Sequence, residues 1–325
     1  MSDFRWGILG TGGIAQAFAL DLAYLDGHSV AAVGSRSNES AKSFAEKFPG
    51  CAPYGSYEDL VQADVDAIYV ASPHPMHEEH AMLAMRAGKP VLCEKAFTIN
   101  EAQAANLINY SHQKQIPLME AMWTRFLPHI AQIKKIIEAG TLGEIHTVIA
   151  DHGQYIPIER ALRLWEPTLG GGALLDLGIY PLTLAHLVLG APESITAKAT
   201  LTDQNVDLQT SMILNYKSGA HAMLSCTMAV RSSVSAVIAG EKARIEIDGS
   251  FYAPTSFRVI TRDGEVSEYP KNYQGGGLRE EAQEFARMVR AGEIESPLMT
   301  HETTLELMRQ MDEVRRQIGV KYPSE

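Results

Sequence analysis

A glycine-rich turn near the start of the chain constrains its fold more than any other feature. The turn, Gly10-Thr11-Gly12-Gly13-Ile14-Ala15, follows the apolar residues 4–9 and opens a segment of helical character. A second apolar run, residues 28–34, comes next. This order predicts a strand, a tight turn, a helix and a second strand, which together form a βαβ unit.

The residues of the turn suit the close approach of a phosphate group. Gly10 allows the tight turn, Gly12 lets the backbone approach a pyrophosphate, and the small Ala15 lets the helix pack closely on its strand. The N–H groups and the positive dipole end of that helix then face an anion. We therefore predict a dinucleotide site; the alternative is a glycine turn that binds nothing.

The end of the second strand indicates which dinucleotide is bound. About 20 residues past the glycine turn, NAD sites usually place Asp or Glu against the ribose 2′-hydroxyl. This chain has Ser35, Arg36 and Ser37 instead. A carboxylate repels a 2′-phosphate, whereas the Arg36 guanidinium can pair with one. We predict NADP (NADPH) in preference to NAD; the alternative for Arg36 is a solvated surface arginine.

The composition limits the possible partners. The chain has 325 residues, enough for two domains, and a net charge of −11 at pH 7. Nucleic acids and anionic membranes bind basic surfaces, so we expect neither as a partner. The longest apolar run, residues 173–189, is interrupted by charged, glycine and proline positions, which argues against a membrane span.

The N-terminus and the cysteines suggest the compartment. Residues 1–5 lead directly into the first apolar run, without the basic stretch and cleavage site of a targeting segment. Cys51, Cys93 and Cys226 are too few and too widely spaced for a disulfide framework or a cysteine zinc site. We therefore expect a cytoplasmic protein.

Strands and helices alternate over the first part of the chain. We expect helices after the βαβ unit at residues 39–48, 56–60, 76–87 and 100–114, and short strands at 66–71, 90–93 and 117–120. This alternation is typical of a parallel sheet with helices on both faces and its ligand at the carboxyl ends of the strands. We predict an α/β fold in which residues 1–121 form a Rossmann domain, a doubly wound parallel sheet that binds NAD(P).

The pattern changes after residue 121. Between residues 145 and 269, several runs rich in alternating and β-branched residues are separated by turn sequences. Further helices are expected at 128–139, 172–189, 279–291 and 300–318. We predict that residues 122–325 form an α+β domain for substrate binding and oligomerisation, with a large, mostly antiparallel sheet. Its open face predicts a homodimer or a dimer of dimers.

Candidate catalytic residues lie beyond the ends of the predicted strands. Glu94 and Lys95 directly follow the strand at 90–93. A lysine beside a bound nicotinamide can donate to a substrate hydroxyl, and its charge lowers the pKa of that hydroxyl. The alternative is an exposed loop lysine.

A second group lies in the apolar helix predicted at 172–189. Asp176 and Tyr180 are four residues apart and share one helix face, where a carboxylate and a phenol need partners. Lys95, Asp176 and Tyr180 near C4 of nicotinamide would supply a proton donor and acceptor for alcohol–carbonyl interconversion. The alternative is an Asp–Tyr hydrogen bond that only braces the helix, and Pro181 favours a kink just after Tyr180.

Three nearby histidines raise the question of a metal. The spacing H-E-x-x-H is absent, because the residue four after His77 is Ala81. We predict no metal site. The loop with Ser72, His74 and His77 is expected beside the nicotinamide ribose, and His80 is interpreted as an ordinary helix residue.

Four segments together resemble one family. The glycine turn, Ser72-Pro73-His74-Pro75-Met76-His77, Glu94-Lys95 and the helix at 171–180 occur in this order in the glucose–fructose oxidoreductase/inositol dehydrogenase family, often called Gfo/Idh/MocA. The similarity covers essentially the whole chain. Residues 118–128 and 318–320 are similar to the branch of dimeric trans-1,2-dihydrobenzene-1,2-diol dehydrogenases and NADP-dependent D-xylose 1-dehydrogenases.

The resemblance implies an NAD(P)-dependent dehydrogenase that acts on a CH–OH group of a sugar, polyol or cyclic trans-diol. It implies that Lys95 is the active-site lysine of the family's E-K-P motif, and that Tyr180 has the acid–base role that histidine has in many members. Ala96 replaces the proline of that motif, and alanine disfavours a cis peptide bond by about 2.5–4 kcal/mol.

The branch motif adds Trp123 and Arg125 near the nicotinamide, and Tyr155 and Phe251 are added as pocket residues without a motif. The predicted cofactor-binding residues are Gly10, Thr11, Gly12, Gly13, Ile14, Ser35, Arg36, Ser72, His74, His77, Glu94, Lys95, Trp123 and Arg125.

Two other classes compete with this interpretation. The first is a non-catalytic NAD(P)-binding sensor or regulatory protein of the same fold, which would have lost the lysine and the helix acid, whereas both are present. The second is a metal-dependent alcohol dehydrogenase.

Overall fold

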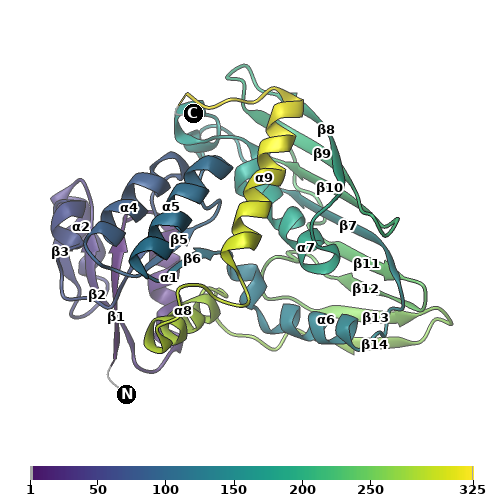
Figure 1. The fold of residues 1–325 in the computed structure, drawn as a ribbon, viewed down its shortest axis with the longest axis horizontal. Helices are drawn as coiled ribbons and strands as arrows, with labels where there is room; N and C mark the ends of the chain where they lie inside the picture. Colours follow the sequence, from purple (N-terminus) through teal and green to yellow (C-terminus); the bar gives the residue numbers. More distant parts are fainter. Residues whose placement is uncertain (1–2, 324) are drawn as a thin grey trace. The chain divides into compact units, whose positions relative to one another are not determined.

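The computed structural model describes residues 3–323 and 325, and the chain divides into two compact units (Figure 1). Unit 1 consists of residues 3–126 and 275–305, and unit 2 of residues 127–274 and 306–325. Each unit is therefore built from two segments of the chain, whereas the division predicted from the sequence is a single one after residue 121.

Unit 1 contains a six-stranded sheet in the order β3-β2-β1-β4-β5-β6. Every neighbouring pair is parallel, which confirms the predicted doubly wound parallel sheet. The strands β4, β5 and β6 are buried at every position, as expected for strands with cover on both faces. The strands are β1 (Phe4–Leu9), β2 (His28–Gly34), β3 (Ala52–Tyr54), β4 (Ala67–Val70), β5 (Val91–Glu94) and β6 (Leu118–Ala121).

Some helices of unit 1 begin where local sequence rules place them. The Ser56 side chain caps α3 by accepting from the N–H of Asp59, and the Asn100 side chain caps α5 by accepting from the N–H of Gln103. The helices are α1 (Gly13–Asp21), α2 (Asn38–Ala45), α3 (Tyr57–Leu60), α4 (His77–Arg86), α5 (Glu101–Lys114) and α8 (Arg279–Ala291), with 3₁₀ turns at Leu22–Tyr24, His74–Met76 and Trp123–Phe126.

One carboxylate ties the returning segment 275–305 to the rest of unit 1. Asp21, the last residue of α1, accepts backbone N–H groups of Gly276 (2.6 Å), Gly277 (2.9 Å), Leu278 (2.7 Å) and Arg279 (3.0 Å). These groups form the start of α8, where a helix lacks internal acceptors and favours negative charge. The side chain of Asp21 thus fixes where α8 begins.

Unit 2 contains an eight-stranded sheet in the order β14-β13-β12-β11-β7-β10-β9-β8. Only the pair β7–β10 is parallel, which confirms the predicted, mostly antiparallel sheet. The strands are β7 (Ile145–Gly153), β8 (Ser194–Leu201), β9 (Asp207–Asn215), β10 (His221–Thr227), β11 (Ala236–Gly240), β12 (Ala243–Ile247), β13 (Phe257–Thr261) and β14 (Val266–Tyr269).

Helices cover one face of this sheet. Figure 1 shows α6 (Pro128–Glu138) and α7 (Ile179–Leu189) along it, and α7 packs on β7 and β10. The last part of α9 (His301–Ile318) joins β8, because the Gln317 side chain bonds the backbone of Ala197 and Ile195. Two short 3₁₀ turns, Leu162–Leu164 and Pro167–Leu169, precede α7.

The opposite face of the sheet exposes a row of apolar side chains. Met223 of β10 is 44% exposed, and it pairs in register with Ile149 of β7, also 44% exposed, and with Ile213 of β9, which is 47% exposed. Along β10, exposed and buried positions alternate, as in a strand with one face on a core.

The first half of the predicted helix 172–189 is not an α-helix in the structure. Residues Leu174–Gly178 form a π-helix, and α7 continues from Ile179. Pro181 offers a physical reason, because its missing N–H removes an α-helical bond one turn earlier.

Among the described residues, Pro167–Leu189 has the length and mean hydropathy (1.5) of a membrane-crossing helix. However, 72% of its most apolar window is buried within the molecule, as in the core helix of a soluble protein.

Candidate active site

The glycine turn joins β1 to α1 and leaves open space in front of the helix. Gly10 has φ +113°, and a Cβ there would lie 2.8 Å from the carbonyl oxygen of Ala71, so the position requires glycine. A Cβ at Gly12 or Gly13 would meet no described atom within 4 Å. No side chain of the described residues caps α1. The first N–H groups of α1 can therefore receive a diphosphate, and the residues fit a dinucleotide.

Arg36 lies exposed after the end of β2. Its guanidinium hydrogen-bonds Tyr57; burial raises the pKa of the Tyr57 hydroxyl, and Arg36 opposes that rise. Ser35 accepts the N–H of Ser37 (3.3 Å), and Ser37 caps α2. A cation and two hydroxyl groups therefore lie at the predicted 2′-phosphate position. A cavity of about 340 Å³ near the turn is lined by Thr11, Glu39, Ser40, Ser43, Phe44 and Lys47.

His77 connects two loops at the carboxyl ends of β4 and β5. Its Nε2 lies 2.7 Å from the carbonyl of Ser72, and its Nδ1 lies 3.0 Å from the carbonyl of Ala96 and 3.2 Å from that of Phe97. The side chain is fully buried, and burial lowers the pKa of His77 to about 4. Its position is that of an internal brace for the loop that carries Lys95. His74 is also buried, with its ring centroid 5.6 Å from that of His77.

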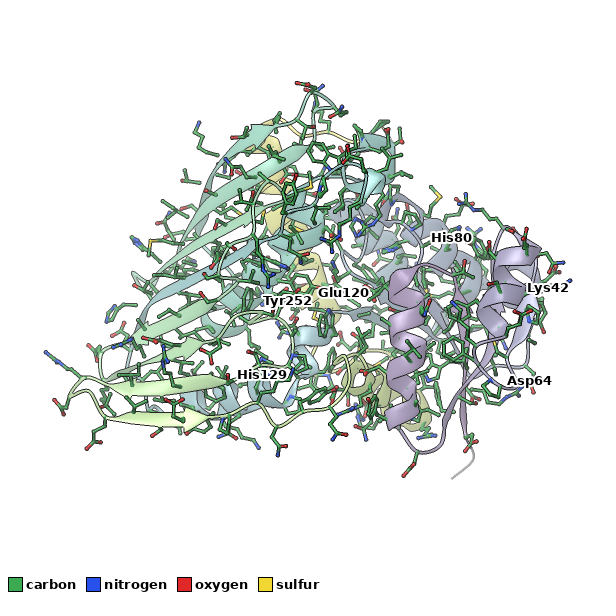
Figure 2. All side chains as sticks on the ribbon, turned by 180° about the vertical axis from the view of Figure 1, so that it is seen from behind. Lys42, Asp64, His80, Glu120, His129 and Tyr252 are labelled. Atoms are coloured by element: carbon green, nitrogen blue, oxygen red, sulfur yellow. The ribbon has the colours of Figure 1, made fainter. Side chains whose placement is uncertain are left out.

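His80 has more contacts than an ordinary helix residue. The Nδ1 atom of His80, which is labelled in Figure 2, lies 2.9 Å from Oγ of Ser72. Its ring packs edge-on against that of Tyr57, with 4.7 Å between the centroids. Burial lowers the pKa of His80, and the Arg36 charge lowers it further. The sequence contained one clue, since His77 and His80 are three residues apart and share a face of α4.

The loop after β5 begins with a buried carboxylate. Glu94 accepts from the Tyr69 hydroxyl and from the backbone N–H of Lys95, the latter at 3.1 Å. Lys95 is half-buried, and the peptide bond between Lys95 and Ala96 is cis.

Two more carboxyl groups lie buried in unit 1. Glu120, on β6, is labelled in Figure 2, and burial raises its pKa to about 7. Its Oε2 accepts from the Thr304 hydroxyl at 3.0 Å. Burial, reinforced by the Glu94 charge, raises the pKa of Glu281 well above its usual range.

Trp123 and Arg125 follow β6, and Arg125 Nε donates to the Leu298 carbonyl at 2.8 Å. Burial lowers the pKa of Arg125 to about 10.

Asp176 lies on the π-helix of unit 2. It accepts from Nη2 of Arg163 at 3.0 Å, and its side chain is only 13% exposed. The N-terminal end of the π-helix is held by Asp207, whose Oδ2 accepts from the N–H of Leu174 (2.8 Å) and the Thr210 hydroxyl (2.8 Å). Burial raises the pKa of Asp207 to about 7.

Tyr180 lies in the first turn of α7 within a group of aromatic rings. Its centroid is 5.2 Å from that of His152 and 4.6 Å from that of Tyr252. Sequence reasoning missed four residues, because no motif or helical spacing links them to Asp176 or Tyr180: His152, Gln154, Arg163 and Tyr252. Of the two pocket residues added without a motif, Tyr155 is exposed and Phe251 is fully buried.

The predicted residues divide between the two units. The predicted cofactor residues and Lys95 belong to unit 1, and Asp176 and Tyr180 belong to unit 2. The convergence of Lys95 with Tyr180 stays a prediction.

One possible metal-binding group lies elsewhere. Among the described residues, Glu144, His146 and Glu241 bring ligand atoms within 4.8 Å of one another, and all three are exposed. Exposed acidic groups of this kind are common without an ion, and the absence of a metal site stays a prediction.

Comparison with known proteins identifies the family. Residues 4–121 match the family described as "Oxidoreductase family, NAD-binding Rossmann fold", and residues 130–246 match the "GFO/IDH/MocA C-terminal domain". The trans-1,2-dihydrobenzene-1,2-diol dehydrogenase of Xenopus tropicalis is 35% identical over 98% of this chain and 99% of that protein. The chain belongs to the Gfo/Idh/MocA oxidoreductase family.

Further proteins are similar to this chain over nearly its whole length. The D-xylose 1-dehydrogenase (NADP(+)) of Hypocrea jecorina is 35% identical, over 98% of this chain and 93% of that protein. A 3-ketoreductase from Actinomadura kijaniata, solved with NADP and TDP-benzene, superimposes with a TM-score of 0.88 at 29% identity over 98% of each chain. The aldose-aldose oxidoreductase of Caulobacter crescentus, complexed with glycerol, gives a TM-score of 0.88 at 25% identity over 97% of each chain. The family resemblance drawn from the sequence is confirmed.

Proposed function

We propose that this family member is an NADP-dependent oxidoreductase that transfers a hydride between nicotinamide and a hydroxyl or carbonyl carbon of a sugar or cyclic trans-diol. The observation that carries the proposal is the near-full-length similarity to a diol dehydrogenase and an NADP-dependent xylose dehydrogenase. The fit of the glycine turn to a diphosphate supports it.

The roles of the residues follow from their chemistry. Bound NADP supplies the hydride transfer at C4 of its nicotinamide. In the oxidation direction, Tyr180 in its phenolate form accepts the proton of the substrate hydroxyl and becomes the neutral phenol. The positive charge of Lys95 lowers the pKa of the substrate hydroxyl and of Tyr180, and Asp176 orients the two groups. Arg36, with Ser35, binds the 2′-phosphate.

A substrate screen tests the reaction. Aldoses, inositols and trans-diols are each mixed with NADP⁺, and the absorbance of NADPH is followed. We expect turnover with at least one class, unchanged by a strong chelator. Absence of turnover with every class, while NADPH still binds, would favour the non-catalytic sensor, and loss of activity with the chelator would favour a metal-dependent dehydrogenase.

A variant of the lysine tests the assignment of the site. Lys95→Met is expected to abolish turnover while NADPH binding, measured by fluorescence titration, persists. Lys114→Met is the matched control, because Lys114 is exposed in the last turn of α5. Turnover by Lys95→Met at the parent rate would exclude a catalytic role for Lys95.

We also propose that the open face of the eight-stranded sheet forms a homodimer or dimer of dimers. The apolar row of Ile149, Met223 and Ile213 supports this, because burying such a row favours association. Met223→Lys should lower the molar mass measured by light scattering, and an unchanged mass would exclude this face.

A cytoplasmic location without nucleic-acid or membrane partners is proposed as well. The net charge of −11 and the free cysteines Cys51, Cys93 and Cys226 support it. Cell fractionation tests the location.

A further inference from the structure

Pro181 deprives a helix carbonyl of its usual donor. In an α-helix, the carbonyl of residue 177 accepts from the N–H of residue 181, and proline has no N–H. Nδ1 of His152, on β7, lies 3.2 Å from the Leu177 carbonyl oxygen, toward which the N–H of Ile179 is also directed. Because a carbonyl oxygen only accepts, Nδ1 of His152 must carry the proton of this hydrogen bond.

The protonation of Nδ1 fixes the next residue. A neutral imidazole protonated on Nδ1 accepts at Nε2. The atom that faces Nε2 is the side-chain nitrogen of Gln154, at 3.0 Å, so Gln154 presents its NH₂ group and not its oxygen. The same nitrogen also donates to the hydroxyl oxygen of Tyr252, at 3.4 Å. The carbonyl of Leu177 therefore sets the direction of the hydrogen bonds that link it through His152 and Gln154 to Tyr252.

This relay of His152, Gln154 and Tyr252 holds two rings against Tyr180. The rings of His152 and Tyr252 stack at 4.3 Å with 26° between their planes. The Tyr180 ring is tilted against both, by 56° to His152 and by 36° to Tyr252. Tyr252 lies on the loop between β12 and β13 (Figure 2), so three separate segments of unit 2 meet at Tyr180.

Burial makes the arrangement rigid. His152 is 1% exposed and Tyr180 is 5% exposed, so neither ring can turn without displacing its neighbours. Neither His152 nor Gln154 needs to exchange a proton for the relay to hold. Their contribution is the orientation of the phenol.

Resting on the proposed function, we propose that His152, Gln154 and Tyr252 are positioning residues for Tyr180. They hold its ring in the orientation for proton transfer to and from the substrate, and Pro181 keeps His152 in the form that closes the relay. Proton transfer depends strongly on alignment, because a misplacement of about 1 Å can lower a rate on the order of 100-fold.

Pro181→Ala tests the origin of the relay. Alanine restores an N–H within reach of the Leu177 carbonyl and is the better helix former, so the thermal midpoint should not fall. We expect kcat to fall about 10- to 100-fold, with the Kd of NADPH and the KM of the substrate changed by less than about threefold. Pro128→Ala is the control, because Pro128 occupies the first turn of α6. A parent-like kcat in Pro181→Ala would overturn the proposal.

Two further variants test whether the residues act as one unit. Gln154→Leu removes the bonds to both His152 and Tyr252, and Tyr252→Phe removes only the bond to Gln154. Both substitutions keep a similar volume, and each should lower kcat with little effect on KM. The loss in the double variant Pro181→Ala/Gln154→Leu should be no larger than the greater single loss. Losses that multiply would overturn a common relay.

A spectroscopic measurement separates this proposal from the proposed function. In ¹⁵N NMR of the cofactor-free protein, His152, assigned by the loss of its resonances in His152→Gln, should show a proton on Nδ1. Pro181→Ala should lose that preference. A proton on Nε2 in the parent would overturn the relay even if turnover is found. If no substrate is turned over, the proposed function fails, and the tautomer still decides whether the relay exists.

Discussion

Removal of the Asp21 carboxylate should destabilise the start of α8 and with it unit 1. Asp21 accepts hydrogen bonds from four backbone N–H groups around the start of α8, where the first N–H groups of a helix lack acceptors within the helix. Two of these bonds, to Gly277 and Leu278, are buried. Asp21→Ala would remove the carboxylate oxygen that accepts from these two buried N–H groups.

The magnitude follows from those two groups. A buried N–H without an acceptor costs about 1–3 kcal/mol, so two cost about 2–6 kcal/mol. Water can reach the partly exposed Gly276 and Arg279 groups, so their loss adds less. Asp21→Asn keeps one acceptor oxygen but loses the charge and turns an NH₂ group toward a donor. The order of stability should therefore be parent, then Asp21→Asn, then Asp21→Ala.

Urea denaturation followed by tryptophan fluorescence measures this order, because Trp6 is fully buried in unit 1. Asp26→Asn is the matched control: Asp26 is exposed, and its substitution should change the free energy of unfolding by less than about 0.5 kcal/mol. If Asp21→Ala were as stable as this control, the carboxylate would not hold α8, and the explanation for the segment 275–305 would be wrong.

Three shorter predictions concern the cofactor and the buried acid. Gly10→Ala should abolish NADPH binding measured by calorimetry, because its Cβ would lie 2.8 Å from the Ala71 carbonyl at φ +113°. Arg36→Asp should lower the ratio of NADPH to NADH affinity at least about 10-fold, the effect of about 1.4 kcal/mol, and an unchanged ratio would exclude Arg36 as the phosphate ligand. Burial raises the pKa of Glu120 to about 7, so the folded state holds the Glu120 proton more tightly than the unfolded state does. The stability that this proton contributes is therefore complete below about pH 4.5 and lost as the pH rises to about 7, up to about 3 kcal/mol. Glu120→Gln should flatten this pH dependence in urea titrations, and an unaltered slope would assign it to other groups.

Local rules predicted much of the fold because the relevant interactions are local. The glycine turn, the Ser56 cap and the Asn100 cap each involve residues within four positions of one another, and all three are present. The strand β3 was missed, because three residues that include Pro53 show neither alternation nor an apolar run. It is an edge strand next to β2, where proline is tolerated.

The role of Asp21 could not be predicted in the same way. At the end of α1 a carboxylate faces the negative end of the helix dipole, so the local sequence makes Asp21 unfavourable. Its partners, Gly276 to Arg279, lie more than 250 positions later in the chain. Asp21 becomes favourable only because the segment 275–305 returns to unit 1 and places the start of α8 against its carboxylate.

The effect of Pro181 can be predicted from the sequence only in part. A buried carbonyl must find a donor, so a proline inside a helix predicts that the carbonyl four residues earlier is bonded from outside the helix. The sequence therefore contains the requirement for a donor to Leu177 but not the identity of that donor. Any buried His, Asn, Gln, Ser or Thr of the facing sheet could meet it, and only the register of β7 selects His152. The identity of Tyr180 as a candidate could thus be predicted from its spacing to Asp176, whereas the orientation of its ring depends on pairing between strands.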